Sequence, residues 1–413
     1  MLTSTKPDSS GKEAAIFRSR QITEFKWTPV GDIPAFSKTA DKVFLPAGVE
    51  QKGMIYSSAE PNDKFIAENV SFETILTVIA NPDSAIYHKN LNGHGNSWSY
   101  FGIVCSGLVR YALDIKPRST TKCWQDIPGM VKIAEAGAYT AEDIQLCDIL
   151  LIYDKRKHVV LITDVLRDEN GKVQKVEVSE AIPTTCVRNQ YDLETFYEKY
   201  TGFSLWRYDF VDTVSMPDAE ENASLQRGVP GLPSVAVDCG NKANYRAEED
   251  VVISSFADGE NQVEVCCDGE ILETLSFSGK GKISKQFNRG YYVLKQKNTG
   301  ETVEFCVTDP QIKHTVKDGM ITIQADPCDS QSKILYMDFR EKSKGERMAE
   351  KGFETNGVAF YSTKAAVLSK VELLTEEEQK NGVFTRELPE DAVNFKVYFE
   401  NKYGVWTHTM IRI

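Results

Sequence analysis

Apolar residues recur at helical spacing in the segment 105–113, CSGLVRYAL. The spacing i, i+3, i+4, i+7 and i+8 forms a single apolar stripe, which is typical of a helix that packs on a core. The members of the stripe are Cys105, Leu108, Val109, Ala112 and Leu113. The pattern predicts an amphipathic helix with Cys105 in its first turn. Another helix start is indicated in 71–80, SFETILTVIA, where a serine is closely followed by Glu73.

Strand patterns follow this helix. The segment QLCDILLIYDKRKHVVLITDVL contains two apolar runs joined by DKRK, and His158 opens the second run. After the turn RDENGK comes VQKVEVSEA, whose alternation predicts a strand that pairs with the His158 strand. On this strand Val176, Val178 and Glu180 share one face, while Lys175, Glu177 and Ser179 share the other.

The pattern changes near residue 217. The segment 217–233 is rich in acidic residues, proline and glycine and is interpreted as a linker after a mixed helix and strand domain, 1–216. From 234 onward the chain shows short strands and turns, including an Asp268-Gly269 hairpin signal. The lengths fit two immunoglobulin-like β-sandwich modules, 234–309 and 310–413. The predicted fold class is therefore an α+β domain followed by two all-β domains.

Composition and charge exclude several classes of function. The chain has 413 residues, 41% of them hydrophobic, and a net charge of −12, which argues against nucleic acid as a partner. No apolar run is long enough to span a membrane, and the polar start MLTSTKPDSSGKEAA is unlike a signal peptide. The nine cysteines lack the spacing of a disulfide framework, and His88 and His94 lack further ligands at metal-binding spacing. No metal or cofactor is expected.

Cys105 and His158 are candidates for nucleophilic catalysis. Backbone amides and the dipole at a helix start stabilise an anion, so a thiolate in the first turn is populated near neutral pH. The small residues Ser106 and Gly107 leave room for a substrate beside the sulfur. His158, at the edge of a core strand, is placed to take the thiol proton. The alternative is that Cys105 is only a buried core residue of the apolar stripe.

A third group is expected to orient the imidazole ring of His158. The candidates are Glu180, Ser179 and, farther along the chain, Asn189. A two-residue turn at Asn170-Gly171 would place Ser179 on the face of His158, whereas a three-residue bulged loop would place Glu180 there.

These motifs together resemble a known family. The order CSGLVRYAL, then CDILLIY and HVVLITDV, then a hairpin return that ends in VSEA, is similar to NlpC-like bacterial cysteine peptidases and the related CHAP amidases. The segment KGMIYSS also resembles the Gly-x-Pro-Tyr segment of that family, with Ile55 in place of proline. The match covers roughly residues 50 to 205. Val104 and Cys147 depart from the pattern, at positions where an acidic or amide residue and a glycine are usual.

The resemblance implies a papain-like fold and a function. The fold would be a helix packed on an antiparallel sheet, and the activity would be hydrolysis of amide bonds in peptidoglycan stem peptides. Cys105 would be the nucleophile, His158 the general base and Glu180 the orienting residue. Tyr56 would stand near the thiol. The resemblance places such a protein outside the cell or in the cell envelope, and the polar start of the chain leaves a cytoplasmic location as the alternative.

An insertion before Cys105 supplies candidate substrate-binding residues. The stretch YHKNLNGHGNSWSYF contains His94, Trp98 and Tyr100, which with Tyr56 and Ser106 are expected to line the substrate cleft. The alternative for the stretch is a surface loop anchored by its aromatic residues. The β modules carry no catalytic motif and are expected to act as spacers or as docking surfaces for glycans or proteins.

Three hypotheses follow from the sequence. The leading one is a cysteine peptidase or amidase that acts on peptidoglycan peptides through a thioester. The second is a transglutaminase-like acyl transferase, which also uses a cysteine on a helix and a histidine on a strand. The third is a non-catalytic, multidomain surface-binding protein.

Overall fold

The computed structural model describes most of the chain. The described residues are 2–34, 43–56, 72–88, 102–115, 124–125, 127–152, 157–182, 185–217, 231–327, 332–341, 367–390, 392–402 and 406–413. Contacts divide the chain into two compact units, each made of two segments. Unit 1 comprises Met1–Ala59 and Gly95–Val229, and unit 2 comprises Glu60–His94 and Pro230–Ile413.

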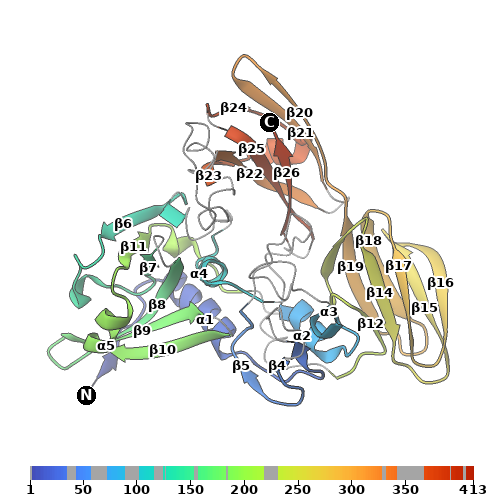
Figure 1. Cartoon of the computed structure of the whole chain (residues 1–413), viewed down its shortest axis with the longest axis horizontal. Helices are drawn as coiled ribbons and strands as arrows, with labels where there is room; N and C mark the ends of the chain where they lie inside the picture. Colours follow the sequence, from blue (N-terminus) through green and yellow to red (C-terminus); the bar gives the residue numbers. More distant parts are fainter. Residues whose placement is uncertain are drawn as a thin grey trace, which may run out of the picture. The chain divides into compact units, whose positions relative to one another are not determined.

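Unit 1 is built on an antiparallel sheet, which in the described residues has seven strands (Figure 1). Six of them follow one another in the order β10 (Cys186–Asp192), β9 (Val173–Ala181), β8 (His158–Arg167), β7 (Ile149–Ile152), β11 (Ser204–Tyr208) and β6 (Met130–Ala134). The short β1 (Thr3–Ser4) pairs with β8. The first eight residues of β8 are buried, so this strand lies at the centre of the core.

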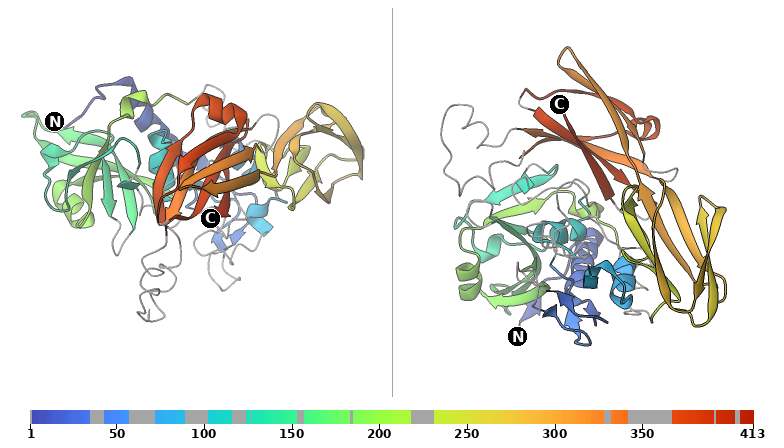
Figure 2. Two further views of the ribbon diagram at one scale, coloured as in Figure 1. Left: turned by 90° about the horizontal axis from the view of Figure 1, so that it is seen from above. Right: turned by 45° about the vertical axis from the view of Figure 1, so that its right-hand side comes forward.

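Helices α1 (Ser10–Glu24) and α4 (Cys105–Ala112) contact each other and the sheet at β8, β9 and β10 (Figures 1 and 2). The buried side of α1 includes Ala15 and Ile22, and that of α4 includes Leu108 and Val109. The first helix has a side-chain cap, because Ser9 Oγ accepts a hydrogen bond from the Lys12 amide. The remaining short elements of this unit are β2 (Lys26–Trp27), β3 (Ile33–Pro34), β4 (Val43–Leu45), β5 (Gln51–Lys52), η2 (Ala141–Asp143), α5 (Leu193–Lys199) and η3 (Val211–Thr213).

The first β module of unit 2 consists of two sheets (Figures 1 and 2). One sheet has the order β12 (Val235–Val237), β14 (Asp250–Ser255) and β17 (Gly281–Gln286). The other has the order β13 (Ala243–Arg246), β19 (Thr302–Thr308), β18 (Gly290–Gln296), β15 (Glu260–Cys267) and β16 (Glu270–Ser278), with β13 parallel to β19. The predicted hairpin turn is confirmed, because Asp268 and Gly269 take the positive φ values of 50° and 92° that a tight hairpin requires.

The second β module also pairs two sheets over one core. Its strands are β20 (Gln311–Lys317), β21 (Met320–Asp326) and β24 (Val383–Glu387) in one sheet and β23 (Val367–Leu373), β22 (Lys333–Glu341), β25 (Ala392–Glu400) and β26 (Trp406–Arg412) in the other. A hydrophobic cluster joins Ile321 and Ile323 of β21 to Phe339 of β22 and Phe395 of β25. The short helix α9 (Glu376–Asn381) begins at a capping box formed by Thr375 and Glu378. The chain is therefore a mostly β, multidomain protein.

Two helices that precede Cys105 in the sequence belong to unit 2. These helices, α2 (Phe72–Ala80) and α3 (Ala85–His88), lie next to the first β module. Glu73 pairs with Lys242 at 2.6 Å, and the Asn81 amide group donates to the Val237 carbonyl at 3.2 Å. The sequence placed residues 71–80 within the N-terminal domain 1–216, and the contacts instead group them with the β modules.

We expect Gly240→Ala to weaken the docking of α2. Gly240 has φ +87°, and a Cβ there would lie 2.6 Å from the Thr74 carbonyl oxygen and 2.6 Å from Val78. An alanine held in the left-handed backbone conformation lowers the free energy of unfolding by about 1 kcal/mol. The steric clash lowers it by about 1 to 3 kcal/mol more. The thermal unfolding midpoint of the full chain should therefore fall.

Gly279→Ala is the matched control for this substitution. Gly279 also has a positive φ, +96°, but no described atom lies within 4 Å of a Cβ built there. The two variants share the backbone cost, so only Gly240→Ala should show the additional destabilisation. Equal midpoints for the two variants would contradict the close packing of α2 against Gly240.

Candidate active site

Cys105 lies at the first residue of α4, as the apolar stripe predicts. The residue before it, Val104, is extended, with φ −94° and ψ 172°, and provides no side-chain cap. The first amides of a helix have no partner within the helix, and the helix dipole favours negative charge beside them. The thiol is 6% exposed. Its position therefore combines shielding from water with a local field that favours a thiolate.

A glycine allows a neighbouring chain segment to approach this helix closely. A Cβ at Gly107 would lie 2.8 Å from Ile103 Cγ1. Ile103 in turn forms a parallel bridge with Tyr56, and its amide donates to the Ile55 carbonyl at 2.9 Å. Gly107 thus makes room for the bridge that brings the Tyr56 segment alongside the start of α4.

Burial and nearby charge act on Tyr56. Burial raises the pKa of the Tyr56 hydroxyl to about 12, and negative charge on Cys105 and Cys186 acts in the same direction. The phenol is therefore neutral and able to donate a hydrogen bond at physiological pH. Tyr56 therefore lies within electrostatic range of Cys105.

His158 is the first residue of β8 and is 8% exposed. Its Nε2 lies 2.9 Å from Glu180 Oε2. The edge of its ring meets Phe203, with ring centroids 6.2 Å apart and an interplanar angle of 84°. The Cys105 side chain also acts on this ring, and its interaction raises the pKa of His158. Because Nε2 faces Glu180, this leaves Nδ1 for the thiol.

The charge balance at His158 favours the imidazolium form. Burial acts to lower the pKa of His158, but the hydrogen bonds and charges of Cys105 and Glu180 outweigh it and raise the pKa to about 9. A doubly protonated ring between a thiolate and a carboxylate is the state from which a cysteine nucleophile reacts. The geometry thus brings together the Cys105 thiol, the His158 imidazole and the Glu180 carboxylate.

The strand register explains why Glu180 reaches His158. The hairpin between β8 and β9 closes where the Asp168 amide donates to the Lys172 carbonyl at 2.9 Å, with Gly171 at φ 78°. This is the three-residue loop, which is the alternative that favours Glu180. Two register shifts along the hairpin offset each other, so that Leu161 lies opposite Ser179. Glu180 therefore shares the face of His158, because side chains alternate along a strand.

The other two candidates for the orienting position are not beside the imidazole. Ser179 is fully buried on the opposite face of β9, and its hydroxyl has no hydrogen-bond partner among the described residues. Asn189 lies opposite Val178 on the neighbouring strand β10, two residue pairs away from the pair of Val187 with Glu180. The observed contact of His158 is with Glu180 alone of the three.

A cluster from the end of α5 supports Glu180 from behind. Lys199 Nζ lies 3.0 Å from Glu180 Oε1, and the Tyr200 hydroxyl donates to the same oxygen at 3.1 Å. Burial raises the pKa of the Glu180 carboxyl, but hydrogen bonds from His158 and Lys199 outweigh burial, and the net shift is downward. Sequence reasoning missed Lys199 and Tyr200. In the sequence these two residues are only a basic residue followed by an aromatic one at a helix end. Many helices end in this way, so the pattern does not indicate a functional site.

The remaining predicted substrate-binding residues divide into two groups. Ser106 follows Cys105 in α4 and is 7% exposed. His94, Trp98 and Tyr100 lie outside the described residues.

One departure and one shared position of the resemblance have structural counterparts. Cys147 takes φ 67°, in the left-handed region that favours glycine, which is the residue usual at this position in the resembled family. The next residue, Asp148, is fully buried, and Arg207 binds both of its carboxylate oxygens at 2.7 and 2.9 Å. This pair ties the start of β7 to β11 and stands apart from the thiol site.

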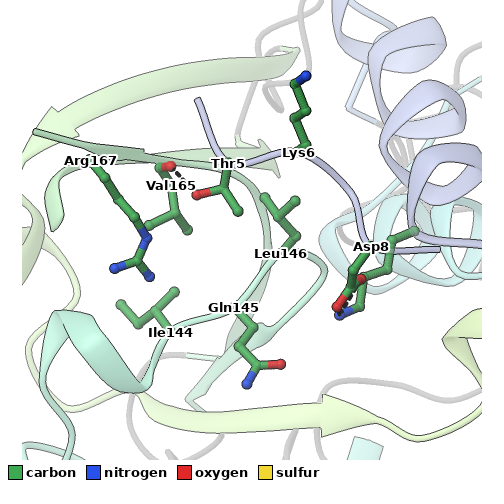
Figure 3. Close-up of a pocket in the computed structure, with 9 residues that line it drawn as sticks. Thr5, Lys6, Asp8, Ile144, Gln145, Leu146, Val165 and Arg167 are labelled. Carbon is green, nitrogen blue, oxygen red and sulfur yellow. Dashed lines mark hydrogen bonds and ion pairs between the residues drawn. The ribbon is translucent and has the colours of Figure 1, made fainter. Parts of the chain in front are cut away.

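A pocket of about 110 Å³ lies elsewhere in unit 1 (Figure 3). Its lining residues are Thr5, Lys6, Asp8, Lys12, Ile144, Gln145, Leu146, Val165 and Arg167. Two of its cations are balanced, since Lys12 pairs with Asp8 at 3.0 Å and Arg167 pairs with Glu142 at 2.7 Å. It includes none of the Cys105, His158 and Glu180 cluster.

The described part of the chain contains neither a metal-binding cluster nor a membrane-spanning helix. No group of three or more histidine, cysteine or acidic residues there is arranged to hold a metal ion. No helix there has the length and apolarity to cross a membrane.

Comparison with known proteins yields no family. No family model matches the chain, and no curated protein matches it. Among solved structures, Escherichia coli α2-macroglobulin spanning domains NIE-MG1 is 9% identical, with a TM-score of 0.16, over 44% of this chain and 97% of that one. Its MG0-NIE-MG1 fragment is 10% identical, with a TM-score of 0.17, over 72% of this chain and 89% of that one.

Fibronectin(III)-like modules of Clostridium thermocellum CbhA are 13% identical to the chain, with a TM-score of 0.15, over 43% of this chain and 92% of that one. At these TM-scores none of the likenesses carries an argument about function.

We expect the His158 ring to stay doubly protonated up to a pH near 9, the value to which its partners raise its pKa. In Glu180→Gln the neutral amide no longer stabilises the imidazolium, so the ring should lose its proton at a lower pH. Ring ¹⁵N shifts in histidine-labelled protein would measure both titrations, with His158→Ala identifying the signal. An unchanged titration in Glu180→Gln would contradict the electrostatic link between the two residues.

The raised pKa also carries a contribution to stability. A group whose pKa rises on folding stabilises the folded state below its ordinary value, which for His158 is 6.5. This contribution is lost as pH rises through about 9.

Proposed function

We propose that the chain is a papain-like cysteine peptidase or amidase. The observation that carries the proposal is the placement of the His158 ring between the Cys105 thiol and the Glu180 carboxylate. Three further features support it: the cysteine begins a helix, the histidine begins a strand of an antiparallel sheet, and the carboxylate lies on the next strand. The sequence resembles the NlpC-like and CHAP-like pattern, and Glu180 matches the third, orienting position of the CHAP group.

The reaction proceeds by acyl transfer to sulfur. The Cys105 thiolate attacks the amide carbonyl carbon, a C–S bond forms, and the carbonyl electron pair moves onto oxygen. Backbone amides at the start of α4, including that of Cys105, are placed to stabilise this oxyanion. When the oxyanion collapses, the C–N bond breaks and His158 gives its proton to the leaving amine.

Water completes the cycle. His158, now neutral, takes a proton from water as the oxygen attacks the thioester carbonyl. The C–S bond then breaks, which releases the acid product and restores the thiolate and imidazolium pair. Glu180 holds the ring in place through both steps, because its Oε2 remains bound to Nε2.

The proposed substrates are the stem peptides of peptidoglycan, as the resemblance implies, and the chemistry requires no metal or cofactor. The location would then be outside the cell or in the cell envelope. The two β modules are proposed to dock the enzyme to glycan or protein surfaces, a role typical of sandwich domains that accompany catalytic ones.

We expect Cys105 to be alkylated by iodoacetamide near neutral pH faster than Cys266, a half-buried cysteine of the first β module. Replacing His158 with alanine should lower the alkylation rate of Cys105 by about tenfold or more, because the thiolate loses its imidazolium partner. Peptide mass spectrometry measures both cysteines in one sample, so Cys266 is the internal control. Equal rates at Cys105 in the two proteins would contradict the pairing.

Product analysis after incubation with peptidoglycan separates the hypotheses. Hydrolysis yields new amino and carboxyl termini that disappear in Cys105→Ala. Incorporation of an added amine without net hydrolysis would identify an acyl transferase instead. Binding without any new covalent product would identify a surface-binding protein and contradict the proposed hydrolase.

A further inference from the structure

Lys199 occupies a fixed position behind the candidate triad. Its Nζ lies 3.0 Å from Glu180 Oε1 and makes a hydrogen bond with the Tyr191 hydroxyl. The ammonium group also lies over two aromatic rings, 4.6 Å from the centroid of Tyr191 and 5.7 Å from that of Tyr200. Such cation–π contacts and hydrogen bonds restrict the rotamers of a long side chain that would otherwise move freely.

The two oxygens of Glu180 have different partners. Oε2 faces the His158 ring, whereas Oε1 accepts from the Tyr200 hydroxyl and binds the Lys199 ammonium. The Glu180 side chain has no exposed surface, and the Lys199 side chain is 34% exposed. Burial of a carboxylate is unfavourable unless it is paired. Lys199 therefore supplies, from the edge of the domain, the positive charge that compensates Glu180 within it.

The described titratable groups around Glu180 come from four elements. His158 on β8 and the pair Lys199 and Tyr200 at the end of α5 contact the carboxylate directly. Tyr191 on β10 acts through Lys199. Cys105 on α4 faces the imidazole rather than the carboxylate. Of these groups, Lys199 is a cation that takes no part in the proposed proton transfer.

We propose that Lys199 is a positioning residue of the site, which holds Glu180 ionised and directed at His158 and so keeps the site active in mildly acidic solution. This inference rests on the proposed function of Cys105 and His158. It adds to that function the pH range in which the site is active. The negative charge on Glu180 favours the imidazolium, and the imidazolium in turn favours the thiolate.

The direction of the effect follows from the charges. Lys199 contributes to the lowered pKa of Glu180. Without the ammonium group, Glu180 takes up a proton at a higher pH. A neutral Glu180 no longer favours the imidazolium of His158, so the reactive thiolate is lost earlier as the solution is acidified. The rate of Cys105 alkylation falls on the acidic side of its pH profile, and we call this fall the acidic limb. The acidic limb should therefore move to higher pH.

The test measures the rate of Cys105 alkylation between pH 3 and 8 in the full chain. We expect Lys199→Met to move the midpoint of the acidic limb upward by about one pH unit, the lower end of the effect of a neighbouring charge on a carboxyl group. Lys199→Arg should restore the wild-type profile, because it keeps the positive charge. Lys172→Met, at an exposed hairpin position, is the control for the loss of a lysine charge from the same domain.

A second variant covers the case in which Lys199→Met does not fold. Tyr191→Phe keeps all charges but removes the hydroxyl that holds the ammonium, so it should shift the limb in the same direction by a smaller amount. Thermal unfolding of each variant identifies a loss of fold, in which Cys105 would react as an ordinary exposed thiol with a pKa of about 8.5. Only variants that stay folded across the pH range are compared.

The outcomes separate this inference from the proposed function. A fast wild-type Cys105 with an unmoved acidic limb in both Lys199→Met and Tyr191→Phe would overturn the role of Lys199 and leave the proposed hydrolase intact. A shift in Lys199→Met that Lys199→Arg does not reverse would also overturn it, because charge would not be the cause. A wild-type Cys105 no faster than Cys266 would overturn both proposals together.

Discussion

The hydrogen bond between His158 and Glu180 is the interaction on which the site depends. It joins the first residue of β8 to the next strand at 2.9 Å, in a place where both side chains are removed from water. Low local dielectric strengthens such a bond and equally raises the cost of losing either partner. With Nε2 engaged, Nδ1 is the ring nitrogen that remains for the interaction with Cys105. Helix α4, the sheet and the α5 cluster all act on this one contact.

The sheet positions the contact through its register. Because the side-chain period of a strand is two, a slip of one residue would place Ser179 at His158 and turn Glu180 away. The three-residue loop at Gly171 and the paired irregularities along β8 and β9 together fix the productive register. The chemistry thus depends on backbone geometry about ten residues from the reacting atoms, in a part of the hairpin that has no chemical role of its own.

Much of this could be predicted from the sequence, where the information is local. Helical periodicity placed Cys105 at a helix start, and the turn before His158 placed that residue at a strand start. The choice between Ser179 and Glu180 was not local, because it depends on two bulges that the sequence does not encode by composition. The Lys199 cluster and the grouping of α2 with the β modules were missed for the same reason, since both arise from packing between separate elements. The sequence indicates these segments, but it does not indicate which other segments they contact.

The central claim is that Cys105, His158 and Glu180 act as one unit, and a double-variant cycle tests it most directly. The measurement is the rate of Cys105 alkylation near neutral pH in wild type, His158→Ala, Glu180→Ala and the double variant. If Glu180 acts only through the imidazole, the double variant reacts at the rate of His158→Ala, because residues that act as a unit are not additive. Additive losses in the double variant would show that Glu180 affects the thiol independently, and would contradict the account.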